Sequence, residues 1–322
     1  MSTEESPRAV LAALGANLGI AATKTLAFAL TGAASMLAEA IHSFADSGNQ
    51  ALLLLGGKRS RRAPSSEHPF GYGRERYVYA FIVSIVLFSV GGLFALYEAY
   101  HKYDEVHGGH RNELLESRWW WVPVVVLAVA IGMEGFSLRT AVVESNKSRG
   151  DVSWVAFIRR AKSPELPVVL LEDVAALIGL VLALAGVGLT LLTRNGYWDV
   201  AGTTGIGLLL VCVAVVLGIE TKSMLLGEAA ALEDQEAVVA AISGAGGPAG
   251  AGLAIIHLRT MQLGPGSVLV ACKIAVAPDD RAADVAAAID AAEERIRAAV
   301  PGATYVFIEP DVRRPVDDAP PS

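Results

Sequence analysis

Long apolar runs dominate the chain up to residue 219 and determine the elements that the sequence predicts. A helix needs about 20 residues to cross about 30 Å of hydrocarbon, and six runs reach that length. They lie near residues 9–31, 35–56, 77–99, 119–138, 166–192 and 199–219. The pattern therefore predicts an α-helical membrane protein with six transmembrane helices.

After Glu220 charged residues become frequent, and no later run is long enough to span a membrane. Helical patterns cover 233–243 and 282–300, and strand-like patterns cover 254–260, 268–276 and 305–309. This α-β-β-α-β order predicts a soluble domain built as an open α+β sandwich. We expect four parts: an N-terminal tail (1–8), a transmembrane domain (9–222), a cytoplasmic α+β domain (223–311) and a disordered tail rich in Pro and Asp (312–322).

The loops between the apolar runs differ in charge. The loop 58–76 contains six basic and two acidic residues, and the loop 139–165 also contains six basic residues. The loop 98–118 has three basic and five acidic residues. Because cytoplasmic loops hold the excess of Lys and Arg, these counts place both termini in the cytoplasm.

Composition supports a membrane protein and limits its partners. With 53% hydrophobic residues, 18% charged residues and a mean hydropathy of +0.46, the chain is too apolar for an ordinary soluble enzyme. A net charge of -7 argues against a nucleic-acid partner, which needs a basic surface. Cys212 and Cys272 lie in segments of different character and predict no disulfide framework. The acidic start of the chain lacks a basic leader, so the first apolar run is expected to be a retained span.

The second apolar run has its polar residues on one face. At 100° per residue they fall within about 120° of arc. They are Glu39, His42, Ser43, Asp46, Asn49 and Gln50. An ionisable side chain at membrane depth costs about 2.5 to 3.5 kcal/mol, which makes this face a candidate functional site. His42 and Asp46, four residues apart, can bind one cation together, and their donor atoms suit zinc.

The other polar residues of this face have alternative roles. Ser43, Asn49 and Gln50 are expected to join neighbouring helices by hydrogen bonds. Two roles stay open for Glu39. It either packs helices together, or it lies at the mouth of the ion path or supports the ligands. In the first run Asn17 and Lys24 share a face, where Asn17 could support the site and Lys24 is expected to snorkel or to pair with an acid.

The fifth apolar run offers further ligands, and zinc usually takes four donors. Glu172 and Asp173 are adjacent within an otherwise apolar helix, where they point about 100° apart. Two arrangements stay open: both carboxylates bind the ion, or one binds it while the other accepts a proton or orients a ligand. Small residues on the Glu172 side are expected to let the second helix approach. They are Ala176, Gly179, Ala183 and Gly186.

Three segments resemble the cation diffusion facilitator family of zinc transporters. They read TGAASMLAEAIHSFAD at 31–46, HPFGYGRER at 68–76 and ETKSMLLGE at 220–228. The resemblance covers residues 9–310. It implies a homodimer, a tetrahedral transport site between the second and fifth helices, exchange of metal for protons, and a ferredoxin-like cytoplasmic domain.

The chain departs from the family's usual His-x-x-x-Asp pattern on the fifth helix. With the Asp aligned on Asp173, Val169 occupies the position of the His, and Glu172 becomes its substitute. This segment is similar to a divergent branch that includes a mitochondrial zinc transporter of animals. The resemblance then implies a metal site made by His42, Asp46, Glu172 and Asp173. Three carboxylates leave manganese, iron and cobalt open beside zinc.

The soluble domain departs from the family as well. Where many relatives hold further zinc ions, this chain offers Cys272, with Ile256 and Ile308 at positions where ligands would be expected. His257 and Glu309 only neighbour those positions. A regulatory zinc ion is therefore not expected in this domain.

Together these features predict a proton-coupled antiporter that exports a divalent metal ion, with zinc as the first choice. The ligands must lose protons to bind metal, and histidine titrates near neutral pH, so His42 is the natural switch. A metal-gated channel with the same ligands is the alternative. An enzyme is not expected, because the chain has no His-Glu-x-x-His motif and no nucleophile beside the acidic pair. The expected location is a bacterial inner membrane.

Overall fold

The computed structural model describes residues 7–109, 113–244 and 253–312, and the chain divides into two compact units. The first unit comprises Met1–Arg59 and Arg76–Lys222, and the second comprises Ser60–Glu75 and Ser223–Ser322. The predicted N-terminal tail up to residue 6 and the predicted disordered tail from residue 313 lie outside the described residues.

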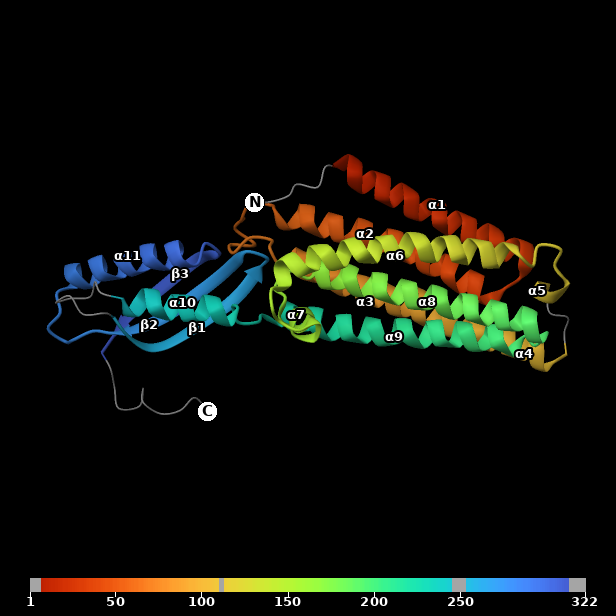
Figure 1. Cartoon of the computed structure of the whole chain (residues 1–322). Helices are drawn as coiled ribbons and strands as arrows, with labels where there is room; N and C mark the ends of the chain where they lie inside the picture. The colour runs from red at the N-terminus through yellow and green to blue at the C-terminus, as the bar shows by residue number, and fades with distance from the viewer. Residues whose placement is uncertain (1–6, 110–112, 245–252, 313–322) are drawn as a thin grey trace. The chain divides into compact units, whose positions relative to one another are not determined.

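The first unit is built from helices, and most of them are long (Figure 1). They are α1 (Pro7–Thr31), α2 (Ala34–Ser60), α3 (Glu75–Val86), the π-helical stretch η1 (Leu87–Leu93), α4 (Phe94–His107), α5 (Glu113–Glu116), α6 (Val122–Arg149), α7 (Trp154–Arg160), α8 (Glu165–Thr193) and α9 (Tyr197–Leu226). The six predicted spans all fall on these helices, although α6 begins at Val122 rather than at residue 119. α6 lies against both α8 and α1 (Figure 1).

Within the described residues, four helical segments are long and apolar enough to cross a membrane. They are Glu75–His107, Val122–Lys147, Glu165–Thr193 and Tyr197–Leu226. The middle of α2 is less apolar because it carries Glu39, His42 and Asp46. The four apolar helices establish the chain as a membrane protein.

The two ends of the first unit differ in chemistry. Exposed tryptophans at 119–121 precede α6, and Tyr197 and Trp198 begin α9, where Tyr197 lies 5.9 Å from the ring of Tyr103. Basic residues occupy the last turns of α2 and α6. Exposed aromatic residues thus lie at the starts of α6 and α9, and basic residues lie at the ends of α2 and α6.

The third predicted span contains a π-helical stretch that the sequence analysis did not predict. η1 includes Gly91 and Gly92, and a Cβ atom added at Gly92 would lie 2.8 Å from Val211 Cγ2 on α9. At Gly207 on α9 an added Cβ would lie 2.7 Å from Leu96 Cγ. Glycines on both helices therefore permit a close approach here, and π-helical stretches often occur at functional positions.

The second unit contains a small mixed sheet. Its elements are α10 (Leu232–Ser243), β1 (Ala254–Gly264), β2 (Ser267–Ala275), α11 (Ala282–Ala299) and β3 (Ala303–Asp311). The strand order is β1-β2-β3, with β1 antiparallel and β3 parallel to β2. Val238 and Ile242 of α10 and Ile296 of α11 pack with alternate residues of β2 to form the core. The predicted α-β-β-α-β order is confirmed.

Cys272 belongs to this core. Its residue is 4% exposed, and it pairs in register with Leu258 of β1 and Ile308 of β3. Burial raises the pKa of the Cys272 thiol to about 11, so the thiol stays protonated at neutral pH. Cys272 therefore serves the second unit as a packing residue. The nearby Glu309 is ion-paired, because its Oε1 lies 3.2 Å from Nζ of Lys273.

The loop that carries the HPFGYGRER segment belongs to the second unit. Arg74 Nη2 donates to Met261 Sδ at 3.0 Å, and the ring of Phe70 meets that of Tyr305 edge-on at 5.2 Å. A Cβ added at Gly73 would lie 2.7 Å from the Leu263 carbonyl oxygen, so only glycine permits this approach to β1. The sequence predicted a basic cytoplasmic loop here but not its packing on the sheet.

Candidate metal transport site

A cavity of about 110 Å³ lies in the first unit among α1, α2, α6 and α8. Four carboxylates line it, those of Asp46, Glu134, Glu172 and Asp173. The other lining residues are Asn17, Ile20, Ser43, Gln50, Met133, Ser137 and Val169. The cavity therefore brings together three of the four predicted metal ligands and Asn17, which was predicted to support them.

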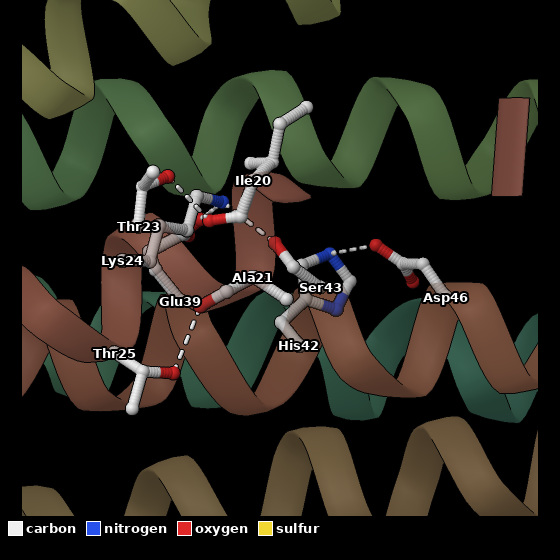
Figure 2. Close-up of polar contacts among 9 residues, drawn as sticks. All are labelled: Ile20, Ala21, Thr23, Lys24, Thr25, Glu39, His42, Ser43 and Asp46. Carbon is white, nitrogen blue, oxygen red and sulfur yellow. Dashed lines mark hydrogen bonds and ion pairs between the residues drawn. The ribbon is translucent and has the colours of Figure 1, made fainter. Parts of the chain in front are cut away.

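The fourth predicted ligand, His42, lies beside the cavity. Its Nε2 is 3.5 Å from Asp46 Oδ2, one helical turn further along α2 (Figure 2). His42 is 1% exposed, and neither ring nitrogen has a hydrogen-bond partner among the described residues. Buried polar groups are normally hydrogen-bonded, so an imidazole in this state is suited to bind a cation together with Asp46.

The two acids of α8 are held by different neighbours. Glu172 Oε1 accepts a hydrogen bond from Asn49 Nδ2 of α2 at 2.7 Å. Asp173 Oδ2 accepts one from Ser137 Oγ of α6 at 3.0 Å. Because both acids line the cavity although they are adjacent in sequence, the edge of α8 between them faces it. That orientation is what binding by both carboxylates requires.

The four predicted ligands do not form a closed site in this structure. Over residues 7–109, 113–244 and 253–312, no three side chains of His, Cys, Asp or Glu are grouped closely enough to hold a metal ion. Asn49 and Ser137 hold the acids of α8, whereas His42 contacts Asp46 of α2. The ligand set of His42, Asp46, Glu172 and Asp173 therefore stays a prediction.

Glu134 of α6 is a cavity residue that the sequence analysis did not identify. It lines the cavity three residues before Ser137, on the same side of the helix. It is a carboxylate inside an apolar span, and the cost of placing such a group at membrane depth would have identified it. The cavity thus receives acids from α2, α6 and α8.

A second polar cluster joins α1 to α2 next to the cavity. Lys24 Nζ lies 2.9 Å from Glu39 Oε2 and donates a hydrogen bond to Ser43 Oγ at 2.8 Å. Of the two roles left open for Lys24, the structure shows pairing with an acid rather than snorkelling, and Glu39 is that acid. Figure 2 shows this cluster and the His42–Asp46 pair along neighbouring turns of α2. Ser43 and Asn49 both form bonds between helices, as predicted for the uncharged residues of this face.

The small residues of α8 face two different helices. A Cβ added at Gly179 would lie 2.8 Å from Glu39 Oε1 of α2, as expected for a close approach of these helices. At Gly186, however, an added Cβ would lie 2.9 Å from the Trp198 carbonyl oxygen of α9. The prediction that these residues admit the second helix is right for Gly179 and wrong for Gly186, because α8 turns Gly186 toward α9.

Replacing Gly179 by Ala is expected to destabilise the first unit by about 1 to 3 kcal/mol, the usual cost of an added methyl group in a packed interior. Glu39 is fully buried and ion-paired, so its carboxylate cannot move aside freely. Thermal unfolding in detergent would measure the effect. Gly188→Ala on the same helix is the matched control, because nothing lies within 4 Å of its added Cβ. Equal stability of the two variants would contradict the predicted contact.

Comparison with known proteins identifies the class of this protein. Residues 10–226 match the family model of the cation efflux transmembrane domain. The chain therefore belongs to the cation diffusion facilitator family, whose members are transporters.

The most informative relatives are zinc antiporters of animals. The chain is 36% identical over 207 residues to the proton-coupled zinc antiporter SLC30A9, mitochondrial, of Xenopus laevis, which is 63% of this chain and 35% of that protein. The Homo sapiens protein of the same name is 35% identical over 206 residues, with the same coverage of 63% and 35%. The resemblance to this branch of the family is thereby confirmed.

A plant relative covers more of the chain. Metal tolerance protein C4 of Arabidopsis thaliana is 31% identical over 238 residues, which is 73% of this chain and 50% of that protein. This chain thus matches about a third of the length of the animal relatives and half of the plant protein. The substrates of the complete relatives are therefore carried over to this chain only as a proposal.

Proposed function

We propose that the protein exports a divalent metal ion, with zinc as its main substrate, in exchange for protons. The observation that carries this proposal is the contact of the buried His42 with Asp46, next to a cavity lined by Glu172 and Asp173. The His42 imidazole is buried and has no hydrogen-bond partner in the described part of the chain. Together with the carboxylates it supplies the nitrogen and oxygen donors that divalent metals take.

We propose six membrane-spanning segments: α1, α2, the continuous α3–η1–α4 segment, α6, α8 and α9. α1 has 25 residues and α2 has 27, so at 1.5 Å per residue both are long enough to cross the hydrocarbon layer. The ionisable residues of α2 are tolerated because they face other helices rather than lipid: Glu39 and His42 are at most 1% exposed. The polar face of α2 thus supports its place inside the helix bundle.

Zinc is preferred because the proposed ligands include an imidazole and because the animal relatives are named zinc antiporters. The carboxylates of Asp46, Glu172 and Asp173 are harder donors, which suit manganese, iron and cobalt as well. We therefore propose zinc as the main substrate and these ions as competitors. Rates for the four ions, measured in one assay, would rank them.

Proton coupling follows from the chemistry of the ligands. A neutral imidazole and ionised carboxylates bind metal, so metal loading from the cytoplasm releases protons and protonation from the opposite side releases the metal. Asn49 and Ser137 fix one oxygen of Glu172 and Asp173, which leaves the other oxygens of these acids to meet the ion. Rocking of the helices around this cavity would then expose it alternately to the two sides.

We also propose that the protein is a homodimer with both termini in the cytoplasm of a bacterial inner membrane, and that its second unit is a ferredoxin-like domain. The orientation rests on the basic loops 58–76 and 139–165, which then lie inside. The animal relatives are named mitochondrial, which is a property of those proteins.

Transport by the purified full chain in liposomes tests the proposed function. Zinc entry would be followed by a trapped dye while a pH gradient is imposed, reversed or abolished with a protonophore. Antiport predicts that zinc flux follows the gradient and that protons move the opposite way. Zinc flux that does not change with the pH gradient would refute antiport. An ohmic zinc current would support the alternative of a metal-gated channel.

A further inference from the structure

The Lys24–Glu39 pair has no assigned role in ion binding, yet it is the most deeply buried ion pair that the structure describes in the first unit. The Lys24 side chain is 4% exposed and that of Glu39 is 0% exposed. Apolar residues of similar size would often hold two helices together as well or better. A buried pair in a membrane domain therefore indicates a role beyond packing.

The pair is directly connected to the cavity. Lys24 Nζ donates to Ser43 Oγ at 2.8 Å, and Ser43 lines the cavity together with Asp46, one turn further along α2. The Ser43 hydroxyl thus links the Lys24 ammonium group to the cavity. Among the described residues that line the cavity there are four carboxylates and neither Lys nor Arg. Lys24 therefore places a positive charge beside an acidic cavity.

Glu39 is only half satisfied. Its Oε2 contacts Lys24, whereas its Oε1 has no hydrogen-bond partner within the described part of the chain and lies against Gly179 of α8. Each member of the pair therefore depends on the other for charge neutralisation. If one member is removed, the charge of the other is left uncompensated next to the cavity, where water does not screen it well.

We propose that Lys24 and Glu39 are positioning residues that set how tightly the cavity holds the transported cation. The ammonium charge weakens binding enough for the ion to leave, and the Glu39 carboxylate limits this repulsion. Through Ser43 the same ammonium also fixes the turn of α2 that precedes Asp46. This inference rests on the proposed function, because it takes the cavity as the place where the ion binds.

Substitutions at the two positions are expected to shift the zinc KM in opposite directions. Lys24→Gln leaves Glu39 without a counter-ion, so zinc binds more tightly, KM falls about three- to tenfold and kcat falls because release slows. Glu39→Gln leaves the ammonium unpaired, so KM rises by a similar factor. The double variant removes one charge of each sign and is expected to return KM toward the wild-type value.

The assay is zinc uptake by the full chain in liposomes, normalised to the amount of inserted protein. Lys24→Arg keeps the charge and is expected to keep KM near wild type. A pair that serves packing alone would lower kcat or stability in both single variants without opposite shifts in KM, which would overturn the proposal. An unchanged KM in Glu39→Gln would overturn it too. If Lys24→Gln does not fold, two results still test the proposal: the rise of KM in Glu39→Gln and the return of KM toward the wild-type value in the double variant.

His42→Ala in the same assay separates this inference from the proposed function. Full zinc transport by His42→Ala would refute the site itself. Loss of transport in His42→Ala, together with KM shifts of the same sign in the Lys24 and Glu39 variants, would refute only the role of the ion pair. Equilibrium zinc binding to the detergent-solubilised full chain gives the same comparison without transport.

Discussion

Replacing Asp46 by Asn is expected to slow zinc transport at least about a hundredfold, because loss of a group that merely supports a metal ligand already costs 10- to 100-fold. Asp46 is the residue that joins the two parts of the site, since it lines the cavity and also contacts His42 at 3.5 Å. The amide has nearly the shape of the carboxylate but lacks its charge and one of its oxygen donors. The variant should therefore fold normally while it fails to bind the ion.

Zinc uptake into liposomes under an outward-directed or inward-directed pH gradient measures this effect. Asp104→Asn is the matched control, because Asp104 is an exposed acid of α4 that does not line the cavity. Thermal unfolding of both variants would show that they are folded. Transport by Asp46→Asn at the rate of Asp104→Asn would remove Asp46 from the site.

Replacing Asp199 by Ala is expected to destabilise the first unit by about 3 kcal/mol or more, the usual cost of removing one partner from a buried charged contact. Asp199 of α9 is 1% exposed. Its Oδ2 accepts from the Ala34 amide at 3.0 Å, and its Oδ1 accepts from the Ser35 hydroxyl at 2.5 Å. The first amides of a helix lack partners and form its positive end, so this acid caps α2 from another helix.

For a unit of this size the loss corresponds to a fall of about 6 to 12 °C in Tm. Asp199→Asn keeps an oxygen that can accept from one amide, so a smaller decrease is expected. Thermal unfolding in detergent measures both, and Asp104→Ala provides the exposed control. Because α2 carries His42 and Asp46 two to three turns beyond the cap, the alanine variant should also transport zinc more slowly. An unchanged Tm would show that α2 does not depend on this contact.

The helices could be predicted from the sequence because their signal is local. A run of about 20 apolar residues has few folds available in a membrane. In the segment after residue 222, the period of the hydrophobic residues identifies the helices and strands. The polar face of α2 was equally clear, since helical geometry alone places its polar residues together. These features gave His42 and Asp46 as neighbours, and the structure confirms that they are in contact.

Contacts between distant segments could not be predicted in the same way. Asp199 caps a helix that begins 165 positions earlier, and nothing near it in sequence shows this. That Glu39 is the partner of Lys24, and that Glu134 meets the cavity, also depend on how the helices rotate against each other. The packing of Arg74 against Met261 joins segments 187 positions apart. Burial and pairing of this kind appear only when the tertiary structure is known.

The sequence left two arrangements open for Glu172 and Asp173: both carboxylates bind the ion, or one binds it while the other accepts a proton or orients a ligand. The structure shows how each carboxylate is held. Both acids line the cavity, but Asn49 of α2 holds one and Ser137 of α6 holds the other. Glu172 is thus linked to the helix of His42 and Asp46, whereas Asp173 is linked to the helix of Glu134. We therefore expect Glu172 to follow α2 and Asp173 to follow α6 when these helices move during transport.

The proposed site binds the exported ion through His42 and the carboxylates of the neighbouring cavity. Gradient-driven zinc flux in liposomes with the full chain tests this, by comparing wild type, His42→Ala and His257→Ala. His257 lies exposed on β1 and serves as the control. We predict zinc flux that follows the pH gradient in wild type and His257→Ala, and no flux above empty liposomes in His42→Ala. Undiminished zinc flux in His42→Ala would contradict the proposed site.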